Sequence, residues 1–175
     1  MSSFLFAAQE GYTDCVKELL SYPSVDVNEK NSTGWTALHA ASQGGHLETV
    51  KLLINSPNII VQPKDKDGIF FFLIFNRVPL YSAAKNGHDE VVKYLLSIKG
   101  TDINAVDNAK YSALHAASAA GHANVVKTLL ENQYVNVNMK FGKNITALYL
   151  AAQNGHLEVI KLLAKHPKIK INEQT

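Results

Sequence analysis

The sequence predicts an all-α solenoid, a stacked array of short helical units, on three observations. The stretch 36–54, TALHAASQGGHLETVKLLI, recurs in near-copies along the chain. Apolar residues within each copy recur at helical spacing. A glycine marks the middle of every copy, at successive spacings of 34, 42, 34 and 34 residues: Gly11, Gly45, Gly87, Gly121 and Gly155. Such a period indicates units that cannot bury their own apolar faces and therefore stack on their neighbours.

The repeated pattern carries a family resemblance. It reads Thr-x-Leu-His-x-Ala, then Gly-His, then Val-Val-Lys-x-Leu-Leu, then Val-Asn, and it resembles the ankyrin repeat. The resemblance covers essentially the whole chain and implies a hairpin, two antiparallel helices and a loop in each unit, stacked into a curved solenoid that binds other proteins. We therefore predict a single ankyrin-repeat domain over 1–175, with repeats at approximately 1–30, 31–64, 65–106, 107–140 and 141–175.

The composition is that of an ordinary globular chain, with 46% apolar and 18% charged residues. The chain contains neither a long apolar stretch nor the pattern of a signal peptide, so neither a membrane span nor secretion is indicated. A cytoplasmic location is the expectation, with a nuclear location as the alternative. Cys15 is the single cysteine, which agrees with a reducing compartment, and its position in a helix pattern predicts a small core residue.

The charge argues against nucleic acid as a partner. The net charge is only +2, and Arg77 is the sole arginine, whereas a surface that reads phosphates in a bidentate manner uses more arginine. A group of lysines near the C-terminus supports only a minor hypothesis, binding to an anionic surface: Lys143, Lys161, Lys165, Lys168 and Lys170.

The first unit has no hairpin ahead of it. Either Ser2 or Ser3 can cap the helix predicted over Phe4–Gln9. This helix begins with three consecutive apolar residues, which cannot all be buried against one neighbour. Either a partner or missing sequence covers this terminus, or the unit is a poor cap. The next helix, Asp14–Leu20, is predicted to bury Val16 and two leucines.

Alternating apolar and polar residues connect the units, as in the segment 24–28, SVDVN. This alternation suits an extended, strand-like segment with one face packed on the preceding helix. The asparagine that follows is interpreted as a turn residue rather than a ligand contact, because its short amide bonds to nearby backbone. It recurs as Asn28, Asn104, Asn138 and Asn172.

In the second unit Thr36 is predicted to cap the first helix, and paired small residues recur in the first helices so that adjoining units approach closely. A larger residue there would overpack the core at a cost of ~1–3 kcal/mol. The glycine that follows is predicted to end the helix in the left-handed conformation.

The third unit departs from the pattern. Between Gly68 and Pro79 it has ten residues where two are expected, beginning IFFFLIF. The insertion, Ile69–Asn76, is either a hydrophobic finger that grips a partner, a segment that folds back on the array, or a gene-model artefact. Its β-propensity and lack of charge also predict a tendency to aggregate.

The fourth and fifth units return to register, and the chain stops just after the segment that would start a sixth. Ile169 and Ile171 are therefore expected to lack a following repeat that covers them. Because both ends are weakly capped, the chain is either a piece of a longer array or associates end to end with other copies.

No pattern of catalysis or metal binding emerges. Six of the seven histidines recur with the repeat, in Leu-His or Gly-His, and neighbours of one class lie too far apart to share a zinc ion. The resemblance implies that these histidines bond to backbone and order the turns. Neither a unique nucleophile–base pair nor a phosphate loop is present. We predict that the protein is not an enzyme and uses no cofactor and no metal.

Positions that differ between units are free to recognise a partner, and the resemblance places them at hairpin tips and at the exposed ends of first helices. Trp35, Tyr111 and Ile145 occupy the same place in three repeats, so they either line the concave side as interface residues or pack on neighbouring hairpins. The full predicted set is Thr33, Trp35, Gln43, Lys66, Asp67, Lys85, Asn86, Tyr111, Ala119, Ile145, Gln153 and Asn154.

Our leading hypothesis is a non-catalytic module that binds a polypeptide through its concave face. The alternative is a regulatory or targeting segment that acts in cis within a larger enzyme or channel. The identity of the partner and the oligomeric state do not follow from the sequence.

Overall fold

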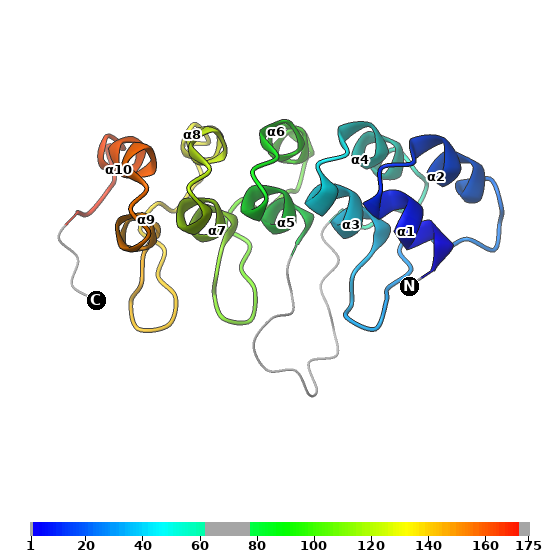
Figure 1. Ribbon diagram of the computed structural model, residues 1–175, viewed down its shortest axis with the longest axis horizontal. Helices are drawn as coiled ribbons and strands as arrows, with labels where there is room; N and C mark the ends of the chain where they lie inside the picture. The colour runs from blue at the N-terminus through cyan, green and yellow to red at the C-terminus, as the bar shows by residue number, and fades with distance from the viewer. Residues whose placement is uncertain (1, 62–77, 172–175) are drawn as a thin grey trace.

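The computed structural model describes residues 2–61 and 78–171, and all structural statements below concern these residues. They form ten helices arranged as five antiparallel pairs side by side, with the chain termini at opposite ends of the array (Figure 1). The helices are α1 Ser3–Gln9, α2 Thr13–Leu20, α3 Ala37–Gly44, α4 Leu47–Ile54, α5 Pro79–Lys85, α6 Asp89–Ser97, α7 Ala113–Ala120, α8 Ala123–Leu130, α9 Ala147–Gln153 and α10 Leu157–Ala164. The prediction of an all-α solenoid is confirmed. The insertion at Ile69–Asn76 lies outside the described residues.

Two parallel rows of helices make up the array. The first helices of the pairs, α1, α3, α5, α7 and α9, pack on one another in sequence, and the second helices form the other row (Figure 1). The described loops that connect one pair to the next, between α2 and α3, α6 and α7, and α8 and α9, extend on the side of the first helices (Figure 1). Buried alanines such as Ala41, Ala83 and Ala117 let the first helices approach closely, as predicted.

Local signals in the sequence set the ends of the helices. Ser2 caps α1 by accepting a hydrogen bond from the backbone N–H of Leu5, and Thr36 caps α3 in a reciprocal capping box with His39. Gly45 and Gly121 end α3 and α7 in the left-handed conformation, with φ of 75° and 78°. The predicted roles of Thr36 and of the central glycines are confirmed.

The connecting segments differ from the extended strands that the alternation predicts. Within the described residues they form turns, and β-bridging is limited to the isolated pairs Val106–Ser112 and Phe141–Ile145. The alternating burial is nevertheless present, because Val135 and Val137 are buried. The hydrogen bonds of these segments run within turns instead of along a ladder, so the apolar residues pack without forming a sheet.

The asparagines of these segments join neighbouring repeats. The side chain of Asn104 donates to the carbonyl oxygen of Tyr134 at 2.7 Å and accepts from the backbone N–H of Asn136 at 2.8 Å. Asn28 and Asn138 bond to the following repeat in the same way. They are therefore structural residues, as predicted, but the backbone that they hold lies about one repeat further along the chain.

The prediction that Cys15 is a core residue is wrong, because its thiol is exposed. The equivalent residues of later repeats, Thr49, Val91, Val125 and Val159, are buried. This position faces the preceding repeat, and in the described structure no repeat precedes the first. The next position faces the following repeat, so Val16 is fully buried while Ile160, in the last pair, is only half-buried.

The two ends of the array therefore expose apolar side chains. Of the three consecutive apolar residues in α1, Phe4 and Leu5 are buried and Phe6 is 46% exposed, as the pattern predicts. At the other end Ile171 is 60% exposed, but Ile169 packs against the core, so the expectation of two uncovered isoleucines is confirmed for only one.

Candidate functional site

The predicted binding residues occupy two places on the same row of helices. Thr33, Trp35, Tyr111 and Ile145 lie in the hairpin loops, whereas the other described members lie at the C-terminal ends of the first helices. Along the chain each first helix separates the two groups, because the hairpin loop precedes its N-terminus and the other group lies at its C-terminal end. Lys66 and Asp67 lie outside the described residues.

A side-chain acceptor closes the hairpin of the second repeat. The Oδ1 atom of Asn31 accepts from the backbone N–H groups of Thr33 and Trp35 at 2.9 and 3.0 Å, and from the Thr33 hydroxyl at 2.7 Å. The Trp35 ring is half-buried and stacks on His39, with centroids 6.0 Å apart. The exposed tip is thus held in a fixed conformation.

In the fourth repeat the side chain of Asp107 closes the hairpin in the same way. Its Oδ1 atom accepts from the backbone N–H groups of Ala109 and Tyr111, each at 2.9 Å, although the residue is only 6% exposed. Neither Asn31 nor Asp107 was predicted from the sequence. Their signal is an Asn or Asp four residues before the aromatic tip residue, since such side chains bond to backbone a few residues later.

The fifth repeat replaces this acceptor with Phe141, which belongs to an aromatic cluster. Tyr111 lies at its centre, with ring centroids 6.2 Å from Tyr81, 5.4 Å from His115 and 4.6 Å from Phe141. Of the two roles considered for Tyr111, packing on a neighbouring hairpin is therefore present. Tyr111 and Phe141 nevertheless remain half-buried, so part of each ring faces solvent.

The ends of the first helices combine a fixed backbone with free side chains. The carbonyl oxygens of Gln43, Lys85 and Ala119 bond to the Nε2 atoms of His88, His122 and His156 in the next described pair, at 2.7, 3.0 and 2.9 Å. The side chains of Gln43 and Lys85 are exposed, as is that of Gln153 in the last pair.

The two predicted asparagines at these helix ends make internal hydrogen bonds. The Asn86 side chain donates to the carbonyl oxygen of Ser82 at 2.8 Å, and the Asn154 side chain donates to that of Ala119 at 3.0 Å. Both residues are exposed, but their amide groups also help to hold the helix ends in place.

The ring of each Gly-His histidine lies against the central glycine of the preceding repeat. A Cβ atom on Gly121, whose φ is 78°, would lie 2.6 Å from the imidazole of His156, so the turn requires glycine for both conformation and space. The rings of His46, His88 and His122 cover Gly11, Gly45 and Gly87 in the same way. The predicted bonding of these histidines to backbone is confirmed.

His115, one of the Leu-His histidines, is a buried part of the fold. Its Nδ1 atom accepts from the backbone N–H of Ser112 at 3.2 Å, and its Nε2 atom bonds to the carbonyl oxygen of Met139 at 2.9 Å. Burial lowers the pKa of His115 to about 4, although backbone hydrogen bonds with Met139 and Ile145 act in the opposite direction. The imidazole is therefore neutral at physiological pH.

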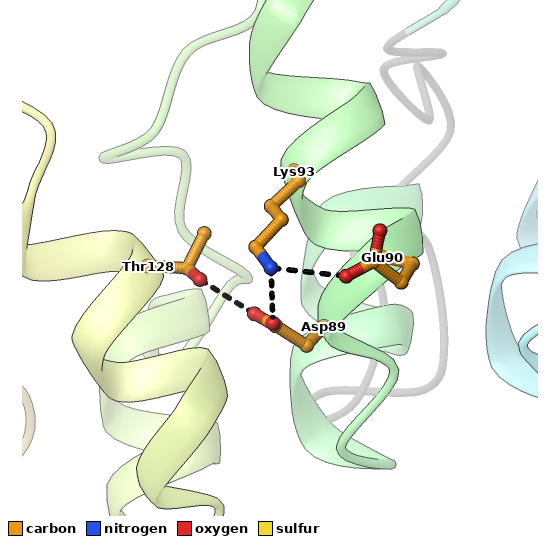
Figure 2. A network of polar contacts seen from close by, with 4 residues as sticks. All are labelled: Asp89, Glu90, Lys93 and Thr128. Atoms are coloured by element: carbon orange, nitrogen blue, oxygen red, sulfur yellow. Dashed lines mark hydrogen bonds and ion pairs between the residues drawn. The ribbon is translucent and has the colours of Figure 1, made fainter.

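A polar network joins two second helices on the other row (Figure 2). Lys93 pairs with Asp89 at 2.8 Å and with Glu90 at 2.9 Å, and the hydroxyl of Thr128 on α8 donates to Asp89. Although burial favours the protonated form, the hydrogen bonds from Lys93 and Thr128 hold the pKa of Asp89 below its usual range. This network is a contact between the third and fourth repeats.

The described residues contain no group of three or more His, Cys, Asp or Glu side chains that could hold a metal ion. In the same part of the chain, every helix is too short or too polar to cross a membrane.

These features define a helical repeat solenoid whose repeated residues bond the units together and whose hairpin tips and helix ends differ from unit to unit. A family model described as ankyrin repeats, in three copies, matches residues 4–107 and 80–175. The chain belongs to the ankyrin repeat family.

One curated human protein also shows similarity. The "SMC5-SMC6 complex localization factor protein 1" of Homo sapiens is 36% identical over 92 residues, which cover 53% of this chain and 8% of that protein. The chain therefore matches a small part of a much longer relative.

Proposed function

We propose that this protein is a non-catalytic module that binds a polypeptide partner through its concave face, made of the hairpin tips and the first-helix ends. Ankyrin repeats generally mediate protein–protein interaction. The observation that carries the proposal is that the backbone and the side chains have different roles at the ends of the first helices. Where the next described repeat holds the carbonyl oxygen, at Gln43, Lys85 and Ala119, the backbone is fixed while the side chain changes from glutamine to lysine and alanine.

The absence of turnover is part of the proposal. The recurring histidines, which are the best candidates for acid–base chemistry, are used in hydrogen bonds that hold neighbouring repeats or cap helices. A general base must instead reach a proton of the substrate.

The test introduces a bulky charge on the proposed face without disturbing the core. Ala120 is exposed at the end of α7, and Asn124 is exposed on α8 in the other row. Proteins captured by the wild type from a cell lysate are identified by mass spectrometry and compared with those captured by Ala120→Arg and by the control Asn124→Arg. We expect Ala120→Arg to lose partners that the control retains. Equal capture by all three proteins would contradict the proposal.

The alternative is that the chain acts in cis, as a regulatory or targeting segment of a larger protein. The observation that favours it is that the similar human protein, named as a localization factor, is far longer than the matching segment. Under this alternative the face binds another part of the same polypeptide, and the isolated chain would capture nothing. A cytoplasmic location, or alternatively a nuclear one, stays a prediction in either case.

We also propose that copies of the chain associate end to end. A histidine ring of the following repeat covers each of four central glycines, Gly11, Gly45, Gly87 and Gly121. By contrast, no atom of the described residues lies within 4 Å of a Cβ atom placed on Gly155. At the other end Tyr12 occupies the histidine position and is 54% exposed. In a head-to-tail contact, the Tyr12 ring of one copy would cover Gly155 of the next.

A further inference from the structure

The hairpins and first helices of the last three repeats have an unusual charge distribution. Their described segments, 78–87, 105–121 and 139–155, contain four lysines: Lys85, Lys110, Lys140 and Lys143. Asp107 is the single carboxylate in these segments, and it is buried and accepts hydrogen bonds from its own hairpin. The described segments on this side of the array therefore carry net positive charge, without an exposed carboxylate.

The carboxylates of the same repeats lie elsewhere. Asp89, Glu90 and Glu158 are on second helices, and Asp102 and Glu131 are in the loops that follow them. The first two repeats differ, because they expose Glu10 and Glu29 on the hairpin and first-helix side. The positive character is thus confined to the part of the face formed by the last three repeats.

Lysines on three of the second helices are paired with glutamates. On the second helices Lys51, Lys93 and Lys161 each form an ion pair with a glutamate three residues earlier, at 2.8, 2.9 and 2.7 Å. Lys85, Lys110 and Lys143 are exposed and have no ion pair within the described part of the chain. Their charges are therefore available to a partner, and such charges steer encounter and select partners of opposite sign.

An apolar anchor lies among these charges. Tyr111 follows Lys110, and its half-buried ring packs edge to face on Phe141, two residues before Lys143. Partly exposed aromatic rings held rigidly by the fold are typical of the residues that dominate the energy of protein interfaces. Lipid headgroups would use the charges but would give this aromatic pair no apolar counterpart. A nucleobase could stack on the rings, but Arg77 is the sole arginine of the chain, which does not favour a surface that reads phosphates.

We propose that the last three repeats bind an acidic polypeptide segment. An apolar side chain of the segment packs on the Tyr111–Phe141 pair, and flanking carboxylates reach Lys110 and Lys143. This inference rests on the proposed function and adds the chemical class of the partner to it.

The test selects short peptides from a random display library on the wild-type protein, and then measures their affinities by fluorescence anisotropy. We expect the selected peptides to carry net negative charge around an apolar residue. The double variant Lys110→Glu, Lys143→Glu should bind them about tenfold or more weakly, equivalent to about 1.4 kcal/mol. The control Lys99→Glu, Lys165→Glu makes the same change in net charge at exposed sites outside these segments and should bind as the wild type does.

Three outcomes of the peptide measurements would overturn the proposal. The selected peptides could be neutral or basic, no peptide could be enriched, or the two double variants could lose affinity equally. Anionic phosphatidylserine vesicles and a single-stranded oligonucleotide are measured beside the peptides. Equally tight binding of either ligand, lost in the double variant Lys110→Glu, Lys143→Glu, would reject a polypeptide-specific site.

The capture experiment separates this inference from the proposed function. If Ala120→Arg loses captured partners while Lys110→Glu, Lys143→Glu retains them, the acidic partner is rejected and the protein-binding function stands. If both variants retain every partner, both proposals fail.

Discussion

The ring centroids of Tyr111 and Phe141 lie 4.6 Å apart in an edge-to-face arrangement, although the two residues belong to different hairpins. Tyr111 also contacts Tyr81 in the preceding pair, so one side chain connects three repeats. We expect Tyr111→Ala to lower the free energy of unfolding by about 3 kcal/mol, since truncation of a packed aromatic ring leaves a cavity.

Urea unfolding followed by circular dichroism measures this effect. Tyr111→Phe is the control and should be closer to the wild type than Tyr111→Ala, because it keeps the ring and removes the hydroxyl, whose hydrogen bond to the carbonyl oxygen of His115 is long, at 3.5 Å. Should Tyr111→Ala unfold at the wild-type urea concentration, the ring would be a surface residue without a packing role.

Glycine at the repeat turns is expected to matter most where a histidine covers it. Gly121→Ala and Gly155→Ala both place a side chain at a φ above 70°, which costs about 1–2 kcal/mol. Only at Gly121 does the new Cβ atom also meet an imidazole, that of His156. We expect Gly121→Ala to cost about 2 kcal/mol more than Gly155→Ala. Equal shifts of the urea midpoint would show that the histidine moves aside freely.

His115 should make the fold sensitive to mild acid. Its folded pKa of about 4 lies below the unfolded value near 6.5, so the unfolded state binds the proton more tightly. The contribution of His115 to the free energy of unfolding is fully present above pH 6.5. It is lost as the pH falls toward 4, by on the order of 3 kcal/mol. Below about pH 4 this residue causes no further loss, because both states are protonated.

The measurement is the free energy of unfolding at several pH values, with the His115 ring titrated by NMR in the folded protein. A His115 ring that titrates near pH 6.5 would remove this source of acid sensitivity.

Two buried serines are expected to be replaceable with a gain in stability. The hydroxyls of Ser42 and Ser118 are buried and have no hydrogen-bond partner in the described structure, and earlier and intervening repeats carry Ala8 and Ala84 at the same position. Ser118→Ala should add about 1 kcal/mol, because it removes an unsatisfied buried group.

Ser112→Ala is the matched comparison on the same helix. Ser112 caps α7 by accepting from the backbone N–H of His115, so its loss should cost about 0.5–2 kcal/mol. Thermal unfolding of the two variants should therefore shift in opposite directions, and a shared decrease would mean that the Ser118 hydroxyl is satisfied.

End-to-end association predicts a sedimentation coefficient that rises with protein concentration. Phe6→Lys at one end or Ile160→Lys at the other should each remove this rise, because a charge in an apolar contact between copies is costly. Ile60→Lys changes a residue that is 51% exposed away from both ends and should leave it intact. A single monomeric species at every concentration would contradict the proposal.

The sequence by itself determined the repeat period, the helices, their caps and the glycines that end them. These features depend on local backbone conformation, which the order of residues such as Thr36 and Gly45 encodes within a few positions. The family and the role of the histidines in bonding to backbone followed from the same repeated motifs.

Only the tertiary structure decided which residues each neighbouring repeat covers. Cys15 and Val16 are adjacent in one helix, yet the thiol is exposed and the valine is fully buried, because one faces a preceding repeat and the other a following one. The Tyr111–Phe141 contact likewise joins residues 30 positions apart. Helical periodicity shows that a face is apolar, but burial depends on what the stacked units place against it.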